Sequence, residues 1–256
     1  MFNRAYCGFT LGHSMAVSRQ DSQPAPAQAP RSRRNGSGRT LADALVDRLR
    51  SDLLAVRFEP GEKLRIDALC QRYDAKATPL REALNRLCAT GLVESRAQRG
   101  FYCAPLKASA LDELITTRIW LESLALRESI AHATVEYDET LVLALHRLSR
   151  APRSLSQERY VSNPDWEALH EAFHQSLLAA CGSGWLLGFC AQLAEQAFRY
   201  RQLAMRNAFK VRPVLDEHQA IVGAVLDRNA DLACQLLAQH FDRTRVSIGH
   251  GLASNN

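Results

Sequence analysis

Long apolar runs are missing from this 256-residue chain, although 46% of its residues are apolar. No uninterrupted apolar stretch approaches the roughly 18 residues that a membrane-spanning helix needs, and none follows Arg4 as a signal peptide would require. Cys-x-x-Cys pairs are missing too, and the seven cysteines are an odd number. These absences argue against a membrane protein and against a disulfide framework, and they favour reduced thiols in a cytoplasmic protein.

Acidic residues are scarce in the first part of the chain, whose net charge is +5 overall. Residues 1–39 contain six Arg and one Asp, residues 40–106 contain eleven basic and nine acidic residues, and residues 107–256 contain fifteen and seventeen. The basic excess therefore lies in the first two parts. Basic tails and small basic domains bind polyanions, whereas the last part needs another kind of partner.

Residues 1–38 are rich in Pro, Ala, Gln, Ser and Arg and have no periodicity. This composition predicts a disordered basic tail. Two interpretations of the tail remain open. It is either an arm that contacts phosphates or a dispensable extension, since Met15 offers an alternative start.

Three helices are predicted between residues 39 and 91. In the first, leucine recurs at every fourth position, as an amphipathic helix requires: Leu41, Leu45, Leu49 and Leu53. A short helix follows over Ile66–Tyr73. We expect Thr78 to cap the third helix with Pro79 at its first position, and we expect Gly91 to end it.

A hairpin and a set of further helices complete the expected fold. Residues 92–103 are predicted to form two short strands around a basic turn, so residues 39–105 outline a winged helix-turn-helix DNA-binding domain. Residues 106–250 are predicted to be an all-helical domain, which makes the chain mainly α. The expected helices of that domain are 109–133, 138–150, 164–181, 184–207, 214–228 and 230–247.

Basic residues gather on adjacent elements of the predicted winged domain. The second helix of a helix-turn-helix presents its N-terminal residues to base edges, and arginine can grip guanine in bidentate fashion. Arg81 lies in the first turn of that helix, where the helix dipole favours an acid, so it indicates an anion nearby. Any one of these residues alone would be a solvated charge, but together they favour DNA binding. The candidates are Lys63, Arg65, Lys76, Thr78, Arg81, Arg99 and Gly100.

Four short motifs carry a family resemblance over this region. Pro60-Gly-Glu-Lys-Leu64, Thr78-Pro-Leu-Arg-Glu-Ala-Leu84, Gly91-Leu-Val93 and Arg99-Gly-Phe101 resemble the DNA-binding domain of GntR-family bacterial transcription regulators. The resemblance implies operator contacts from positions that match the family's own. These are Lys63, Arg81, Arg99 and Gly100.

A histidine pair opens a different question. His170-Glu-Ala-Phe-His174 is a literal H-E-x-x-H, and on a helix its two histidines lie on one face and can share a metal. In zinc peptidases the glutamate, here Glu171, is the general base. A pattern this short also arises by chance, and here it lies in an all-helical region joined to a DNA-binding candidate.

A second resemblance covers the helical region. The Phe173-His174, Glu217-His218 and Gln239-His240 pairs, together with Arg118-x-x-x-Glu122, look like the FCD effector domain of the FadR subfamily of GntR regulators. That domain is a bundle of six or seven helices, commonly with a bound divalent metal. By position the implied ligands are His170, His174, His218 and His240, with His170 where many members have Asp. An all-imidazole set suits zinc or nickel.

The resemblance also implies a small carboxylate effector at the metal. Arg118 is a candidate clamp for it, although Arg118 is equally expected to pair with Glu122 four residues later. Arg201, Arg199 and Tyr200 are candidates for a second clamp, and two clamps would suit a dicarboxylate.

The sequence therefore predicts a regulator and not an enzyme. We expect a homodimeric repressor that binds an inverted-repeat operator, senses a small organic acid and needs no membrane. The linker around Lys107–Leu111 would carry movement between the domains. Two alternatives remain: an H-E-x-x-H zinc peptidase that uses Glu171, and a purely structural metal with DNA binding indifferent to acids.

Overall fold

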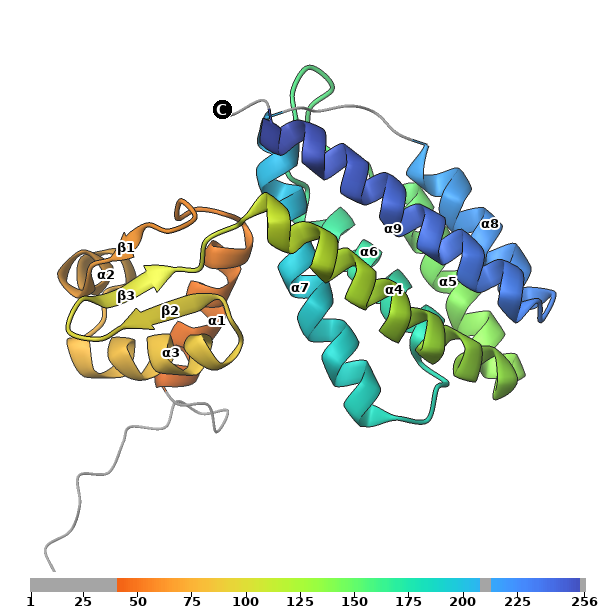
Figure 1. Cartoon of the computed structure of the whole chain (residues 1–256), viewed down its shortest axis with the longest axis horizontal. Helices are drawn as coiled ribbons and strands as arrows, with labels where there is room; N and C mark the ends of the chain where they lie inside the picture. The colour runs from red at the N-terminus through yellow and green to blue at the C-terminus, as the bar shows by residue number, and fades with distance from the viewer. Residues whose placement is uncertain (1–40, 208–212, 254–256) are drawn as a thin grey trace, which may run out of the picture. The chain divides into compact units, whose positions relative to one another are not determined.

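A computed structural model of the chain describes residues 41–207 and 213–253. The predicted disordered tail, residues 1–38, lies outside the described residues. The fold is mainly helical, as the sequence predicts (Figure 1). None of the described helices is both long enough and apolar enough to cross a membrane.

The first part has the order of a winged helix-turn-helix. It consists of α1 (Leu41–Leu54), β1 (Lys63–Leu64), α2 (Ile66–Tyr73), α3 (Ala77–Ala89), β2 (Val93–Arg96) and β3 (Gly100–Cys103). Three leucines of the α1 stripe, Leu45, Leu49 and Leu53, are buried in one core with residues of α3, which confirms the predicted apolar face of α1.

The end of α3 confirms one local prediction and its start corrects another. Gly91 follows the helix with φ +71°, the left-handed conformation that glycine adopts most readily. The cap at the other end is Lys76, without a side-chain hydrogen bond, and not Thr78. Pro79 therefore stands third in the helix and not first, still within the turn where its missing N–H is not needed.

The wing is a three-stranded antiparallel sheet in the order β1-β3-β2. Arg96 pairs with Gly100 at the turn and Val93 pairs with Cys103 at the open end, as the predicted hairpin requires. Strand β1 was not predicted, because a strand of two residues has no periodicity to detect. Leu64 of β1 pairs with Phe101 of β3, and its side chain is buried in the core of the winged part.

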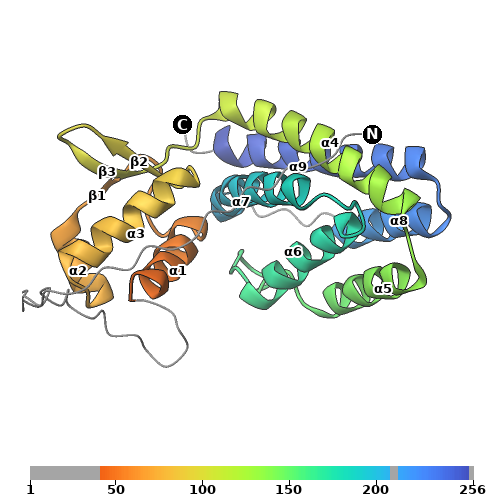
Figure 2. The ribbon, with the colours of Figure 1, turned by 90° about the horizontal axis from the view of Figure 1, so that it is seen from below.

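In the described part of the chain, six helices follow the wing, and all overlap the predicted ranges, although the last one ends at Ala253 and not at residue 247. They are α4 (Ala108–Ala131), α5 (Val135–Arg150), α6 (Pro164–Leu178), α7 (Gly184–Asn207), α8 (Val214–Leu226) and α9 (Ala230–Ala253). The helices α4 and α9 run side by side, and both pack against α7 (Figures 1 and 2). Helix α6 packs against α4 and α5, and α8 packs against α9.

The start of α6 is tied down at two points. The Asn163 side chain accepts a hydrogen bond from the Asp165 N–H at 3.1 Å, and Pro164 occupies the first helical position. The same Asn163 side chain donates to the Pro152 carbonyl at 2.7 Å, which connects the preceding loop to the helix. These contacts fix the helix that carries His170 and His174.

Candidate functional site

The candidate DNA contacts all lie on exposed positions of the winged part. Lys76, Thr78 and Arg81 occupy the start of α3, Lys63 lies in β1 and Arg65 directly precedes α2. Among the described residues, no carboxylate lies within ion-pair distance of any of the five basic candidates. Their charges are therefore available to an external polyanion.

The two arginines near the tip of the wing, Arg96 and Arg99, differ in their contacts. Arg96 packs on the Tyr102 ring at 4.1 Å and pairs with Glu94 at 3.0 Å. Arg99 lies in the exposed turn between β2 and β3, where Gln98 and Gly100 both have positive φ. Of the two, Arg99 is therefore the one presented by the turn.

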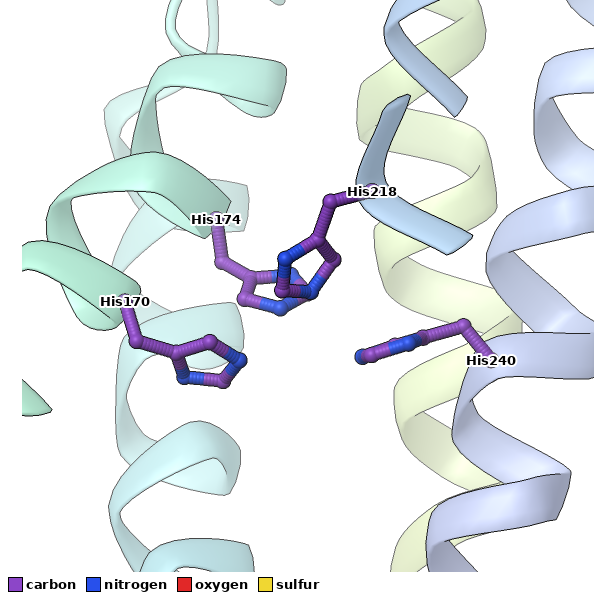
Figure 3. Close-up of side chains that lie close together, drawn as sticks. All are labelled: His170, His174, His218 and His240. Carbon is purple, nitrogen blue, oxygen red and sulfur yellow. The ribbon is translucent and has the colours of Figure 1, made fainter. Parts of the chain in front are cut away.

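The four candidate metal ligands come together although they lie on three helices. His170 and His174 come from α6, His218 comes from α8 and His240 comes from α9 (Figure 3). The ring centroids of His170 and His174 are 4.6 Å apart, and those of His218 and His240 are 4.8 Å apart. One potential ligand atom from each ring lies within 4.8 Å of all the others.

The cluster fits a divalent ion by its chemistry. Around a tetrahedral ion with bonds of about 2.1 Å, neighbouring nitrogens lie about 3.4 Å apart, so rings whose ligand atoms lie within 4.8 Å of one another need only a small shift to share an ion. Nδ1 of His174 is buried and has no hydrogen-bond partner among the described residues. An unsatisfied buried nitrogen is costly unless a ligand uses it.

Burial keeps the two histidines of α6 neutral. It lowers the pKa of His170 well below the ordinary value, and the Arg201 guanidinium and the neighbouring histidines lower it further. The pKa of His174 falls in the same way, first through burial and then through His240 and His218. Neutral imidazoles are the form that binds metal.

A carboxylate orients a third histidine. Nδ1 of His240 lies 2.8 Å from an oxygen of Glu217, so the imidazole donates and the carboxylate accepts. Glu217 in turn pairs with Arg243 at 3.3 Å. A carboxylate behind a histidine fixes which ring nitrogen is free to bind metal. The sequence analysis noted Glu217 only as part of a motif, because its contact with His240 spans two helices.

A cavity of about 840 Å³ opens beside the cluster. Its lining includes His170, His174 and His240, the indole of Trp166, and two of the candidate clamps, Arg118 and Arg201. The volume lies within the range of about 300–1,000 Å³ that is typical of small-molecule sites.

Of the arginines that line the cavity, Arg118 and Arg201 are the candidate clamps, and each has an internal carboxylate partner. The Arg118 guanidinium donates to Glu122 at 2.8 Å, and both side chains are buried. Arg118 thus pairs with Glu122 as expected and also lines the cavity, and its role as a clamp for an effector stays a prediction. Burial raises the pKa of Glu122, and Arg118 opposes that rise. Arg201 pairs with Glu167 and also reaches Nδ1 of His170 at 3.1 Å.

The structure does not bring Arg199 and Tyr200 to this cavity. Arg199 donates to the Ala104 carbonyl at 2.7 Å, and Tyr200 donates to the Lys107 carbonyl at 2.9 Å. Successive residues of a helix point about 100° apart, so only Arg201 of this run faces the cluster. Gln196, one turn earlier on α7, donates to the Thr90 carbonyl at 3.0 Å.

Two functional neighbours were missed at the sequence level. Trp166 stacks on the His170 ring with centroids 4.6 Å apart and an angle of 16°. Glu167 accepts from Arg201 and from Gln202. Their spacing offered a signal, because residues three and four positions before His170 on a helix share its face.

Glu171 lies at the exposed side of the cavity lining. It is exposed, and its carboxylate accepts a hydrogen bond from Gln175 on the same helix at 3.1 Å.

These features define a class of protein: a DNA-binding transcriptional regulator with a separate helical domain for sensing. Residues 41–103 match the gntR family of bacterial regulatory proteins, and residues 113–243 match the FCD domain. The chain belongs to the GntR family and carries an FCD domain. Members of this family are transcriptional regulators and not enzymes, so the peptidase alternative is excluded.

Two curated relatives and one solved structure illustrate the match. The chain is 36% identical to "Uncharacterized HTH-type transcriptional regulator BphR" of Paraburkholderia xenovorans, covering 80% of this chain and 83% of that protein. It is 31% identical to the "HTH-type transcriptional repressor GlaR" of Escherichia coli, covering 81% and 95%. The structure of E. coli McbR/YncC aligns with a TM-score of 0.66 at 18% identity, covering 82% and 97%. That likeness concerns the fold.

Proposed function

We propose that this protein is a repressor that releases its operator when a small organic acid binds beside a metal ion in the FCD domain. Residues 39–105 would bind DNA in the cytoplasm, and residues 106–250 would bind the acid. The observation that carries the proposal is a cluster of four histidines beside a cavity whose lining includes three of them together with Arg118 and Arg201. A relative described as a repressor supports the sign of regulation.

The histidine cluster is the proposed metal site. His174, His218 and His240 would hold a divalent ion, with zinc or nickel suited to imidazole ligands. When bound, such an ion supplies a positive centre that attracts a carboxylate. Arg201 sets His170 apart from the other three histidines, as argued below.

The two cavity arginines favour an anionic effector. Arg118 and Arg201 each form an ion pair with one internal carboxylate. An incoming acid would either replace that carboxylate or bind the same guanidinium beside it. Guanidinium groups match the geometry of carboxylates. Two such groups at one cavity favour a dicarboxylate.

Helix α7 offers a route from the cavity to the DNA-binding part. Arg201 lies beside the histidines, while its neighbours Arg199 and Tyr200 hold the carbonyls of Ala104 and Lys107 in the chain that leads out of the wing. A movement of α7 would therefore move that connection. A tenfold loss of operator affinity needs only about 1.4 kcal/mol of such coupling.

A homodimer on an inverted-repeat operator is the proposed assembly. Two-fold symmetry places two winged domains on two half-sites. Large apolar side chains stand exposed on the neighbouring helices α4 and α7, namely Trp120, Leu124, Trp185 and Phe189. A second copy of the chain would cover them.

The test is an acid titration of the protein–operator complex. An operator is selected from random-sequence DNA, and acetate, succinate and adipate are added to the zinc-loaded protein. We expect at least one acid to release the DNA, and Arg201→Gln should need roughly tenfold more of it. The matched control is Arg147→Gln, which changes an exposed arginine of α5. Operator affinity that ignores every acid would refute the proposal and favour a purely structural metal.

A further inference from the structure

His170 differs from the other histidines in the partner of its Nδ1 atom. Nη1 of Arg201 lies 3.1 Å from Nδ1 of His170. A guanidinium has five N–H donors and no acceptor, so Nδ1 must be the acceptor in this contact. A neutral imidazole that accepts at Nδ1 carries its proton on Nε2.

His240 has the opposite arrangement. Its Nδ1 faces the Glu217 carboxylate, which can only accept, so the proton lies on Nδ1. Nε2 of His240 is then left with its lone pair, the state that binds metal. The same cluster therefore contains one histidine prepared as a ligand and another prepared as a donor.

Several contacts stabilise the tautomer of His170 that carries its proton on Nε2. The Trp166 indole stacks on the ring and fixes its plane. Arg201 is held by Glu167, whose other oxygen accepts from Gln202 at 2.8 Å and from Tyr160 at 3.0 Å. Reversing the tautomer would point an N–H of His170 at a cation. In Figure 3 the ring nitrogen farther from the backbone of His170 points toward the other three rings.

The positive charge of Arg201 also disfavours a metal ion at His170. The Arg201 guanidinium touches the His170 ring and opposes a second cation bound to that ring. An anionic oxygen at Nε2 would instead be attracted by both groups. The ring and the guanidinium together form a donor pair that suits a carboxylate.

We propose that His170 is not a metal ligand in this protein and that its Nε2–H donates a hydrogen bond to a carboxylate oxygen of the effector. The metal would then be held by His174, His218 and His240. This inference rests on the proposed function and departs from the four-histidine ligand set that the family resemblance implies.

The tautomer can be measured directly on the full-length, metal-free protein. Nitrogen-15 NMR of the histidine rings distinguishes a protonated nitrogen from an unprotonated one, and His170→Gln assigns the signals. We expect Nε2 of His170 to be protonated and Nδ1 to be unprotonated. The reverse pattern would overturn the proposal without any variant having to bind metal.

Metal retention gives the second test. After dialysis against zinc and then buffer, we expect His170→Gln to keep as much zinc per chain as the parent, with an affinity within about threefold. His174→Gln should lower the zinc affinity by at least roughly 100-fold, more than loss of a supporting group usually costs. Equal losses of zinc in the two variants would show that His170 is a ligand.

Acid binding gives the third test, measured by calorimetry on zinc-loaded protein with acetate, succinate and adipate. His170→Ala should weaken the tightest acid roughly tenfold or more, and His170→Gln should restore part of the loss because its amide keeps an N–H. His146→Ala, on the exposed face of α5, is the matched control. If the parent binds acid and His170→Ala binds it equally well, this inference fails alone. If the parent binds none of the acids, the proposed function fails with it.

Discussion

The winged part and the helical bundle place their functional charges in opposite environments. Arg81 and Arg99 of the winged part are exposed and make no ion pair with the described residues. Arg118 and Arg201 of the bundle are largely buried, and each is paired with a carboxylate. A surface of exposed charges suits a large polyanion that brings many phosphates, whereas a buried and compensated site suits one small ligand of matching shape and charge.

This contrast predicts that the same kind of substitution has different consequences in the two regions. In the bundle, removal of a charge leaves its partner buried without compensation, so the fold itself is affected. In the winged part, removal of a charge leaves the fold intact and changes only the affinity for DNA. The predictions below test this difference, beginning with the largest expected effect.

The buried pair of α4 should show the largest effect. Glu122→Ala leaves the Arg118 guanidinium buried without its carboxylate, and we expect a loss of about 3–5 kcal/mol in the free energy of unfolding. Urea denaturation followed by circular dichroism measures it. Asp43→Ala is the control, because it breaks an exposed pair with Arg86 and should cost less than about 1 kcal/mol. Equal losses in the two variants would remove the contrast between the regions.

The candidate base contact Arg81 should show an intermediate effect that appears only with DNA. Arg81→Ala should weaken operator binding by about 1–3 kcal/mol and leave the unfolding free energy unchanged within about 0.5 kcal/mol. Fluorescence anisotropy with labelled operator measures the affinity. Arg147→Ala, on the bundle, serves as the control. An unchanged affinity for Arg81→Ala would place the base contact on another residue.

The connection between the two regions should show the smallest effect. Tyr200→Phe removes one hydrogen bond to the Lys107 carbonyl and should lower the unfolding free energy by about 1 kcal/mol. It should also reduce the ratio of operator affinities measured without and with the releasing acid. Tyr102→Phe, which removes a hydroxyl from a partly exposed side chain of β3, is the control. A full acid response in Tyr200→Phe would place the coupling elsewhere.

Local patterns predicted most of the elements. Helix α2 spans Ile66–Tyr73 as expected, and Pro164 and Gly184 begin their helices at the predicted positions. Each of these boundaries depends on residues next to one another in the chain, such as a cap, a proline or an apolar period. The start of α3 was misplaced because Thr78 is a good capping residue next to Pro79, whereas the helix begins at Ala77 with Lys76 as its cap.

The partners within the site were not predictable in the same way. The family resemblance brought His218 and His240 to the cluster, but no local spacing connects His240 with Glu217 or Arg201 with Glu167. These contacts join different helices, so they depend on how the helices pack. The tautomer proposed for His170 rests on such a contact, whereas the sequence motif predicts that His170 is a metal ligand.

The anchored start of α6 has a thermodynamic consequence for metal uptake. Because Asn163 fixes both the helix and the loop before it, His170 and His174 are held in place before any ion arrives. In small zinc domains that are unfolded without metal, much of the binding energy is spent on ordering the chain. Here that entropy is lost during folding, so we expect removal of the proposed ion by a chelator to leave the helical content of the bundle unchanged.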